Sequence, residues 1–156
     1  MRLTDILTED RVLVTRPNGG ITAKGEVIET LAALLSKGTG GDSASIHKVL
    51  SEREQLQSTG IGDGVAIPHG SLDTLENQTA AVVLCPAGVE FQSIDGRPAT
   101  IIVGVVGPRR ATGEHLRMLA RISRLLRDPS FRSRLLASPQ GADAFHIIQT
   151  EEESRP

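Results

Sequence analysis

Hydrophobic positions in this chain follow two spacings, one helical and one continuous. From Thr22 to Gly38 apolar residues recur every three or four positions, which predicts an amphipathic helix with Thr22 as N-cap and Gly38 as its stop. The same spacing predicts a second helix from Asp42 or Ser43 to Leu56 and a third over 112–127, capped by Thr112. Shorter helices are expected after Pro129 and Pro139, the last ending near Ile148. Apolar residues expected to face the core from the second and third helices are Ile46, Val49, Leu50 and Leu56, and Leu116, Leu119, Ile122 and Leu126.

Continuous apolar runs predict buried strands at Val65–Ile67, Ala80–Cys85 and Thr100–Val106, with an extended piece at 11–15 that ends at the Pro/Gly turn 17–20. Asp95-Gly96 between the last two long runs is a hairpin signal. Two helices, then strands, then helices predict a layered α/β or α+β domain with a mixed sheet. We expect residues 1–150 to form one domain and 151–156 to be a frayed tail.

Composition excludes several classes of function. The 156 residues are 38% hydrophobic and 23% charged, with a net charge of −2, so no overall field draws the protein to nucleic acid or anionic lipid. Three Phe and no Trp or Tyr leave little on which bases could stack. No stretch approaches the length of a membrane span, and the charged N-terminus does not fit a signal peptide, so we expect a cytoplasmic protein. The single cysteine, Cys85, lies in an apolar run and is expected to be buried and inert.

The segment STGIGDGVAIPHG, residues 58–70, carries the strongest chemical signal. Its alternate glycines supply no side chains, which favours a sharply turning loop over a packed strand. A short strand then delivers His69 at its end, where backbone N–H groups of the glycine loop could hold an anion. Residues predicted for this loop are Ser58, Thr59, Gly60, Gly62, Gly64 and Gly70.

Two further residues complete a candidate site. His115 would face inward on the first turn of its helix, where the helix dipole favours the neutral ring. Arg53 falls on the apolar side of the second helix, just before the glycine loop. A core histidine and a snorkelling arginine are the structural alternatives. His47 is expected to be a surface residue and His146 a partly buried structural one.

These residue types point to phosphate rather than to metal, nucleotide or hydrolase chemistry. A zinc site needs three or four suitably spaced ligands, and no cysteine or carboxylate cluster supplies them. The sequence contains neither GxxxxGK[ST] nor GxSxG, the signatures of a P-loop and of a serine nucleophile. We therefore expect neither a cofactor nor a metal.

Two stretches resemble a known family. REQLQSTGIGDGVAIPHG, residues 53–70, followed by GEHLRMLARISRLL, residues 113–126, is similar to the IIA proteins of the phosphoenolpyruvate-dependent phosphotransferase system, in its fructose/mannitol and nitrogen-regulatory branch. The resemblance spans nearly the whole chain and is strongest toward the nitrogen-regulatory type, with Ser71 standing where relatives often have lysine.

This resemblance implies an α/β/α sandwich with a mixed central sheet and helices on both faces. It implies that His69 accepts a phosphoryl group from an HPr-like phosphocarrier, with His115 as the second histidine of the site and Arg53 facing the phosphate. Three functions stay open. The chain could be a regulator that binds sensor kinases or ion transporters according to its phosphorylation, a transport component that passes the group to a IIB protein, or a member that is not phosphorylated.

Overall fold

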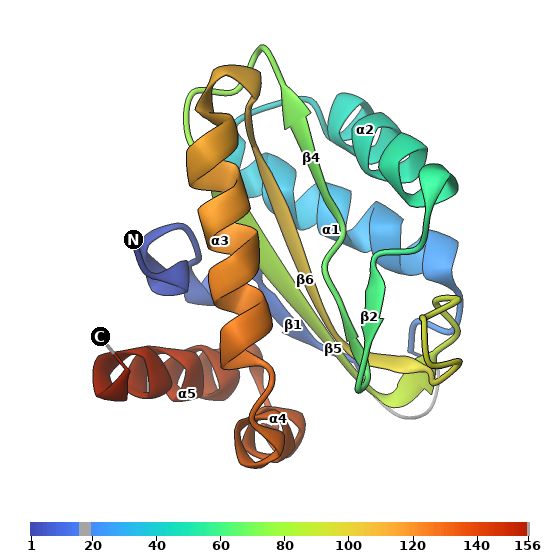
Figure 1. Cartoon of the computed structure of the whole chain (residues 1–156), viewed down its shortest axis with the longest axis vertical. Coiled ribbons are helices and arrows are strands. Elements are labelled where there is room, and N and C mark those ends of the chain that lie inside the picture. The colour runs from blue at the N-terminus through green and yellow to red at the C-terminus, as the bar shows by residue number, and fades with distance from the viewer. Residues whose placement is uncertain (16–19, 156) are drawn as a thin grey trace.

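A six-stranded mixed sheet forms the centre of the protein (Figure 1). The computed structural model describes residues 1–15 and 20–155, so most of the expected turn at 17–20 lies outside the described residues. Strand β6 pairs antiparallel with β5 and parallel with β3 and β4, while β1 runs parallel to β5 and β2 antiparallel to β3. The strands are β1 (Val12–Val14), β2 (Gly60–Gly62), β3 (Val65–Ala66), β4 (His69–Leu72), β5 (Thr79–Val89) and β6 (Ala99–Pro108).

The two long strands confirm the prediction from the continuous apolar runs. Residues of β5 and β6 are buried on both faces of the sheet, and Val82 pairs with Val103 in the antiparallel ladder. The Asp95-Gly96 turn lies in their connection, where Gly96 has a φ of +74°. Strand β2 departs from the prediction of a loop at its glycines.

Helices cover both faces of the sheet, which confirms the α/β/α sandwich (Figure 1). One apolar core joins α1 and α2 to one face, and a second joins α3, α4 and α5 to the other. Alternate residues of β5 divide between them, with Val82 in one core and Val83 in the other. The helices are α1 (Lys24–Thr39), α2 (Ser43–Leu56), α3 (Thr112–Leu125), α4 (Pro129–Leu136) and α5 (Gly141–Ser154).

The ends of α1 and α3 differ from the prediction by one or two residues, whereas α5 runs to Ser154, well past the expected end near Ile148. The Asp42 carboxylate caps α2 by accepting the N–H of Ala44. Helix α1 begins after Ala23 rather than at a Thr22 cap, and it continues past Gly38 to a left-handed C-cap at Gly40. Thr112 is the first residue of α3, not its cap, and its hydroxyl donates to the Arg109 carbonyl.

The expected frayed tail is wrong for residues 151–154, because α5 continues to Ser154. The Glu152 carboxylate is fully buried and accepts hydrogen bonds from the N–H groups of Leu3 (2.7 Å) and Thr4 (2.9 Å). It also accepts from the Thr4 hydroxyl at 3.0 Å and from Arg121 Nε, on α3, at 2.8 Å. The end of the chain therefore ties the N-terminal turn to α3.

Other residues singled out in the sequence have mixed outcomes. Cys85 is buried and His47 exposed, as expected, but His146 is exposed rather than partly buried. No helix in the described part of the chain is long and apolar enough to cross a bilayer.

Candidate functional site

His69 and His115 lie side by side although 46 positions separate them in the sequence. Their ring centroids are 5.7 Å apart, and the planes of the two rings make an angle of 54°. His69 is the first residue of β4, which pairs with the C-terminal end of β6 (105–108), and His115 lies on the first turn of α3. The expectation that His69 would end a strand is wrong, since Ile67 and Pro68 separate it from β3 and it begins β4 instead. Both rings line a hollow of about 500 Å³ that Arg53 also lines.

The His69 ring is oriented by its own backbone neighbourhood. Its Nδ1 lies 2.8 Å from the carbonyl oxygen of Ile67. A carbonyl oxygen only accepts, so Nδ1 carries the hydrogen and, in the neutral ring, Nε2 keeps its lone pair. Burial lowers the pKa of His69, and the Arg53 charge lowers it further, while the Ile67 bond and Glu54 act in the opposite direction. The balance favours a neutral ring with a free Nε2.

His115 is more deeply buried, with 6% of its surface exposed. Its Nδ1 lies 2.8 Å from Oε1 of Gln78, the residue before β5. Its Nε2 has no hydrogen-bond partner among the described residues. Burial, together with the charge of nearby His69, lowers the pKa of His115. Both rings therefore favour the neutral form.

Arg53 brings a permanent positive charge to the same hollow from the last turn of α2. Its Nη1 donates to the carbonyl of Gln57, just past the helix end, at 2.8 Å. This bond occupies one of the guanidinium donors, which leaves others for an anion. The structure thus brings together the three side chains that the sequence singled out, His69, His115 and Arg53.

The predicted glycine loop is divided between two places. Ser58 and Thr59 line a second hollow with Arg53 and His69, and Gly70 lines the first. Gly70 lets β4 approach α2, because a Cβ there would lie 2.9 Å from Cγ1 of Val49.

The other three glycines belong to a hairpin, which corrects the expected single phosphate loop. Gly60 and Gly62 bound β2, and a Cβ on Gly60 would overlap Ser93. Gly62 and Gly64 have φ values of +98° and +78°, so they allow the tight turn between β2 and β3. Bare N–H groups are also fewer than expected, since Thr59 N–H donates to Glu54 and Gly60 N–H to the Ser58 hydroxyl.

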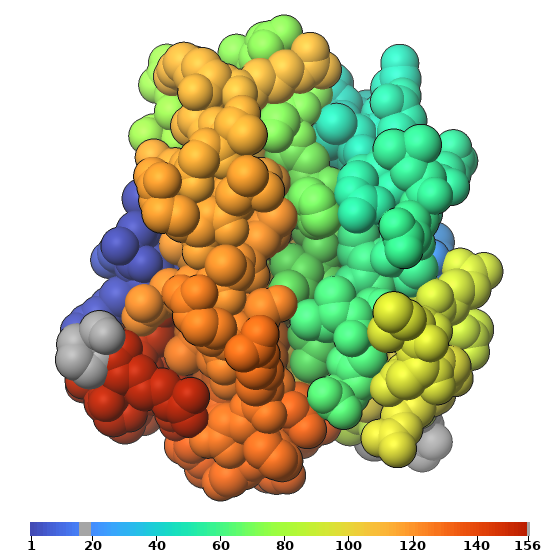
Figure 2. All heavy atoms as spheres, viewed as in Figure 1, coloured from blue at the N-terminus to red at the C-terminus, as the bar shows by residue number. Residues whose placement is uncertain are grey.

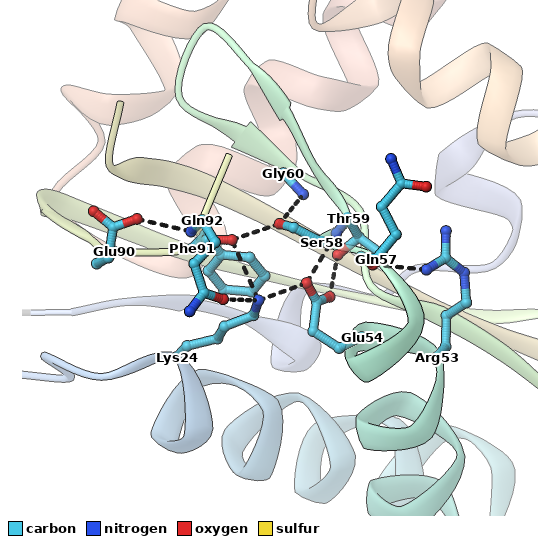
Figure 3. Close-up of polar contacts among 10 residues, drawn as sticks. All are labelled: Lys24, Arg53, Glu54, Gln57, Ser58, Thr59, Gly60, Glu90, Phe91 and Gln92. Carbon is cyan, nitrogen blue, oxygen red and sulfur yellow. Dashed lines mark hydrogen bonds and ion pairs between the residues drawn. The ribbon is translucent and has the colours of Figure 1, made fainter. Parts of the chain in front are cut away.

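A buried ion pair between α1 and α2, beside Arg53 in the sequence, does not follow from the sequence reasoning (Figure 3). Glu54 on α2 approaches Lys24 on α1 to 2.8 Å, and the Glu54 side chain is only 5% exposed. Lys24 also lies 4.9 Å from the Phe91 ring centre and donates to the Gln92 side chain. The sole sequence signal was a second charged residue directly after Arg53, and this pattern alone does not separate a buried carboxylate from an exposed one.

This ion pair is joined to His69 by a continuous series of hydrogen bonds. Glu54 accepts the N–H of Thr59 at 2.8 Å and its hydroxyl at 2.5 Å. The Thr59 carbonyl accepts the N–H of Ile67 at 3.0 Å, and the Ile67 carbonyl accepts from His69. Glu54 thereby fixes the backbone that orients the His69 ring.

The rim of the site is apolar. Leu116 is 59% exposed and Leu56 83% exposed, so the prediction that both face the core is wrong. Both line the hollow that contains His69 and His115. Figure 2 shows this face of the molecule, with α3 on one side, α2 on the other and β4 at the bottom of the groove between them. These two leucines give the hollow an apolar rim beside the Arg53 guanidinium.

The fold and the site define an α/β protein that places two imidazoles and a guanidinium around one open hollow. Comparison with known proteins identifies the family to which this fold belongs. A family model described as phosphoenolpyruvate-dependent sugar phosphotransferase system, EIIA 2, matches residues 6–151. The chain therefore belongs to the EIIA type 2 family of that system.

Individual relatives point to the nitrogen-regulatory branch. A nitrogen regulatory protein of Bradyrhizobium diazoefficiens is 33% identical over 148 residues, covering 95% of each chain. The crystal structure of the nitrogen regulatory protein IIA-Ntr from Neisseria meningitidis matches with a TM-score of 0.83 at 30% identity, covering 92% of this chain and 97% of that one.

A solved complex of enzyme IIA mannitol with phosphorylated enzyme IIB mannitol from Escherichia coli shares the fold, with a TM-score of 0.76 at 20% identity. That match covers 90% of this chain and 95% of the mannitol chain. Together these comparisons confirm the family and the fold that the sequence resemblance implied.

Proposed function

We propose that this protein is a phosphoryl carrier of the nitrogen-regulatory IIA type, phosphorylated on His69 by an HPr-like phosphocarrier. The observation that carries the proposal is the 2.8 Å contact between His69 Nδ1 and the Ile67 carbonyl. It leaves Nε2 as the nucleophile in a ring that burial keeps neutral. Family membership supplies the class of reaction.

In the proposed step, Nε2 of His69 attacks the phosphorus of the donor's phosphohistidine in line. The donor P–N bond breaks, its electron pair returns to the donor nitrogen, and a P–N bond forms at Nε2. His69 keeps its Nδ1 hydrogen on the Ile67 carbonyl, so the phosphorylated ring carries a positive charge beside the anionic group. Such transfers depend on positioning and charge stabilisation more than on further covalent chemistry.

Arg53 and His115 have the supporting roles in this proposal. The Arg53 guanidinium lines the hollow and offers donors for the phosphoryl oxygens. The His115 ring, 5.7 Å from His69 between centroids, is close enough to contact the transferred group. Ser58, Thr59 and Gly70 line the surrounding surface, while Gly60, Gly62 and Gly64 shape the hairpin next to it.

The downstream role we propose is regulatory. A phosphoryl group adds a strong negative charge at the bottom of an apolar-rimmed hollow, which changes what the surface can bind. Sensor kinases or ion transporters are the proposed targets, and a cytoplasmic location stays a prediction from the sequence. A transport role is the second candidate, supported by the fold shared with a IIA protein that was solved together with its IIB partner.

Labelling tests the proposal directly. Incubation with radiolabelled phosphoenolpyruvate, enzyme I and an HPr-like donor should add one acid-labile phosphoryl group to the wild type and none to His69→Ala. His47→Ala is the matched control, since His47 is an exposed histidine on α2, and it should label normally. Label retained in His69→Ala would refute the assignment. Subsequent loss of label to an added fructose- or mannitol-type IIB protein would support the transport role instead of the regulatory one.

A further inference from the structure

Gln78 and His115 are joined by a hydrogen bond that is buried in the protein interior. Gln78 is 5% exposed and His115 6% exposed, and Oε1 of the amide lies 2.8 Å from Nδ1 of the ring. The amide lies directly over Gly107 of β6, where a Cβ would come within 2.1 Å of Gln78 Nε2. The Gln78 amide can therefore lie here only because Gly107 has no side chain.

The amide carbonyl determines which nitrogen of the neutral His115 ring carries the hydrogen. Oxygen only accepts, so Nδ1 must donate and Nε2 must keep its lone pair. That lone pair is buried and has no partner within residues 1–15 and 20–155. A buried acceptor without a partner is costly, and such groups often have a role in binding or catalysis.

A phosphoryl group on His69 would change the requirement at His115. Phosphoryl oxygens are anionic acceptors, and a bare nitrogen lone pair facing them can only repel. A proton on Nε2 converts this repulsion into a charge-assisted hydrogen bond. The Nδ1–H bond to Gln78 is compatible with both states, because it is present in the neutral ring and in the imidazolium.

We propose, building on the function proposed above, that Gln78 is a positioning residue for the phosphoryl site. Its carbonyl keeps the hydrogen of neutral His115 on Nδ1, so Nε2 is bare before transfer and takes up one proton from solvent when His69 is phosphorylated. The resulting imidazolium donates from Nε2 to the phosphoryl group and from Nδ1 to Gln78. Phosphoryl transfer and proton uptake are then coupled within one hollow.

The groups around His115 explain why its Nε2 would be protonated only after His69 is phosphorylated. The positive charge of Arg53 on α2, the start of α3 and burial all oppose a charge on His115 beforehand. His69 on β4 would add a second positive charge, and Glu52 on α2 is the acidic group that lines the same hollow. A phosphoryl group brings a charge of about −1.5 to −2 to the hollow at pH 7, which acts against these effects.

Nitrogen-15 NMR of histidine-labelled protein tests the proposal. In the unphosphorylated wild type, long-range proton–nitrogen correlations should show neutral His115 with its hydrogen on Nδ1. After phosphorylation both nitrogens should be protonated, and the titration midpoint of His115 should rise by about one to two pH units. A hydrogen on Nε2 in the unphosphorylated protein, or a midpoint that phosphorylation leaves unchanged, would overturn it.

Variants separate positioning from mere packing. Gln78→Leu should leave His115 as a mixture of tautomers and slow phosphoryl acceptance about tenfold, the effect of losing one orienting hydrogen bond. Gln78→Glu should keep His115 protonated to higher pH even without phosphorylation. Gln149→Leu, an exposed glutamine on α5, is the matched control and should change neither property. Loss of stability in Gln78→Leu with no change in the His115 tautomer or titration would assign Gln78 a structural role only.

The same design separates this inference from the function on which it rests. If the wild type accepts no label at all, the proposed function fails, and proton uptake on phosphorylation fails with it. The Nδ1 tautomer and the Gln78→Glu shift are measured on unphosphorylated protein, so they decide the positioning role of Gln78 independently.

Discussion

Replacing Glu152 by alanine should destabilise the protein severely, although the residue is only four positions from the last residue of the sequence. The carboxylate is fully buried and accepts four hydrogen bonds, from two N–H groups, one hydroxyl and Arg121. Its removal leaves the guanidinium of Arg121, which is 19% exposed, without its ion-pair partner. The N–H groups of Leu3 and Thr4 lose their acceptor at the same time.

The expected loss follows from these contacts. Removing one member of a buried ion pair costs about 3–5 kcal/mol. Hydrogen bonds to a charged group contribute about 1.5–3 kcal/mol each, but they overlap with the ion-pair figure and are not added to it. We therefore expect the free energy of unfolding to fall by about 4 kcal/mol, a large part of the ~5–15 kcal/mol of a typical domain. In a chain of this length that corresponds to a Tm lower by about 10 °C.

Urea unfolding followed by circular dichroism measures this change. Glu153→Ala is the matched control, because Glu153 is the exposed neighbour on the same helix and should alter stability by less than about 0.5 kcal/mol. Similar small effects for both variants would contradict the buried-carboxylate interpretation and favour the frayed tail that the sequence predicted.

Three further predictions concern the site. Burial lowers the pKa of both His69 and His115, so below the unfolded-state pKa of about 6.5 the unfolded chain binds more protons than the folded one. Urea unfolding should therefore show a lower free energy of unfolding at pH 5.5 than at pH 7.5. A His69→Gln/His115→Gln variant should lose less stability between these two pH values. Glu54→Gln should lower the free energy of unfolding by about 2–4 kcal/mol and slow phosphoryl acceptance, because Lys24 loses its ion-pair partner and the backbone before His69 loses a hydrogen-bond acceptor. Glu29→Gln, on the exposed face of α1, is the control and should match the wild type in both assays. Gly70→Ala should lower the free energy of unfolding by about 1–3 kcal/mol, because the added methyl group overpacks against Val49 of α2. The double variant Gly70→Ala/Val49→Ala should recover most of this stability. A double variant as unstable as the single one would show that the Gly70–Val49 contact is not the cause.

Much of the fold was predictable because it depends on local periodicity. The apolar runs in β5 and β6 and the helical spacing in α1 and α2 each report burial directly. The errors occurred where a residue's environment comes from distant parts of the chain. Leu56 and Leu116 have the spacing of core residues, yet they end up at the rim of the hollow, because no element of the described structure covers them.

The candidate site was predictable to a similar degree. His69, His115 and Arg53 stood out because each occupies an unusual position in its own element, and the structure places them together. Gln78 and Glu54 did not stand out, since an amide in a loop and a carboxylate in a helix are ordinary until their partners are known. Gln78 is 37 positions from His115, and only the packing of α3 against the sheet brings them into contact.

The glycines show the opposite case, in which a regular local pattern has another structural cause than the one it predicts. Alternation of Gly60, Gly62 and Gly64 suggested one loop of bare N–H groups around an anion. In the structure the positive φ values of Gly62 and Gly64 serve a hairpin turn instead. Backbone freedom is a property of the residue, whereas the direction in which an N–H points depends on the pairing of the strands.

The bonds between Glu152 and the first turn also bring the two ends of the polypeptide together, on the opposite side of α3 from α2 (Figure 1). A short peptide joining the ends would therefore span little distance, and the chain could be reopened at the exposed Asp95-Gly96 turn to give a circular permutant. For the same reason, a reporter or a neighbouring domain attached at either end would lie away from the hollow and leave it accessible to partners.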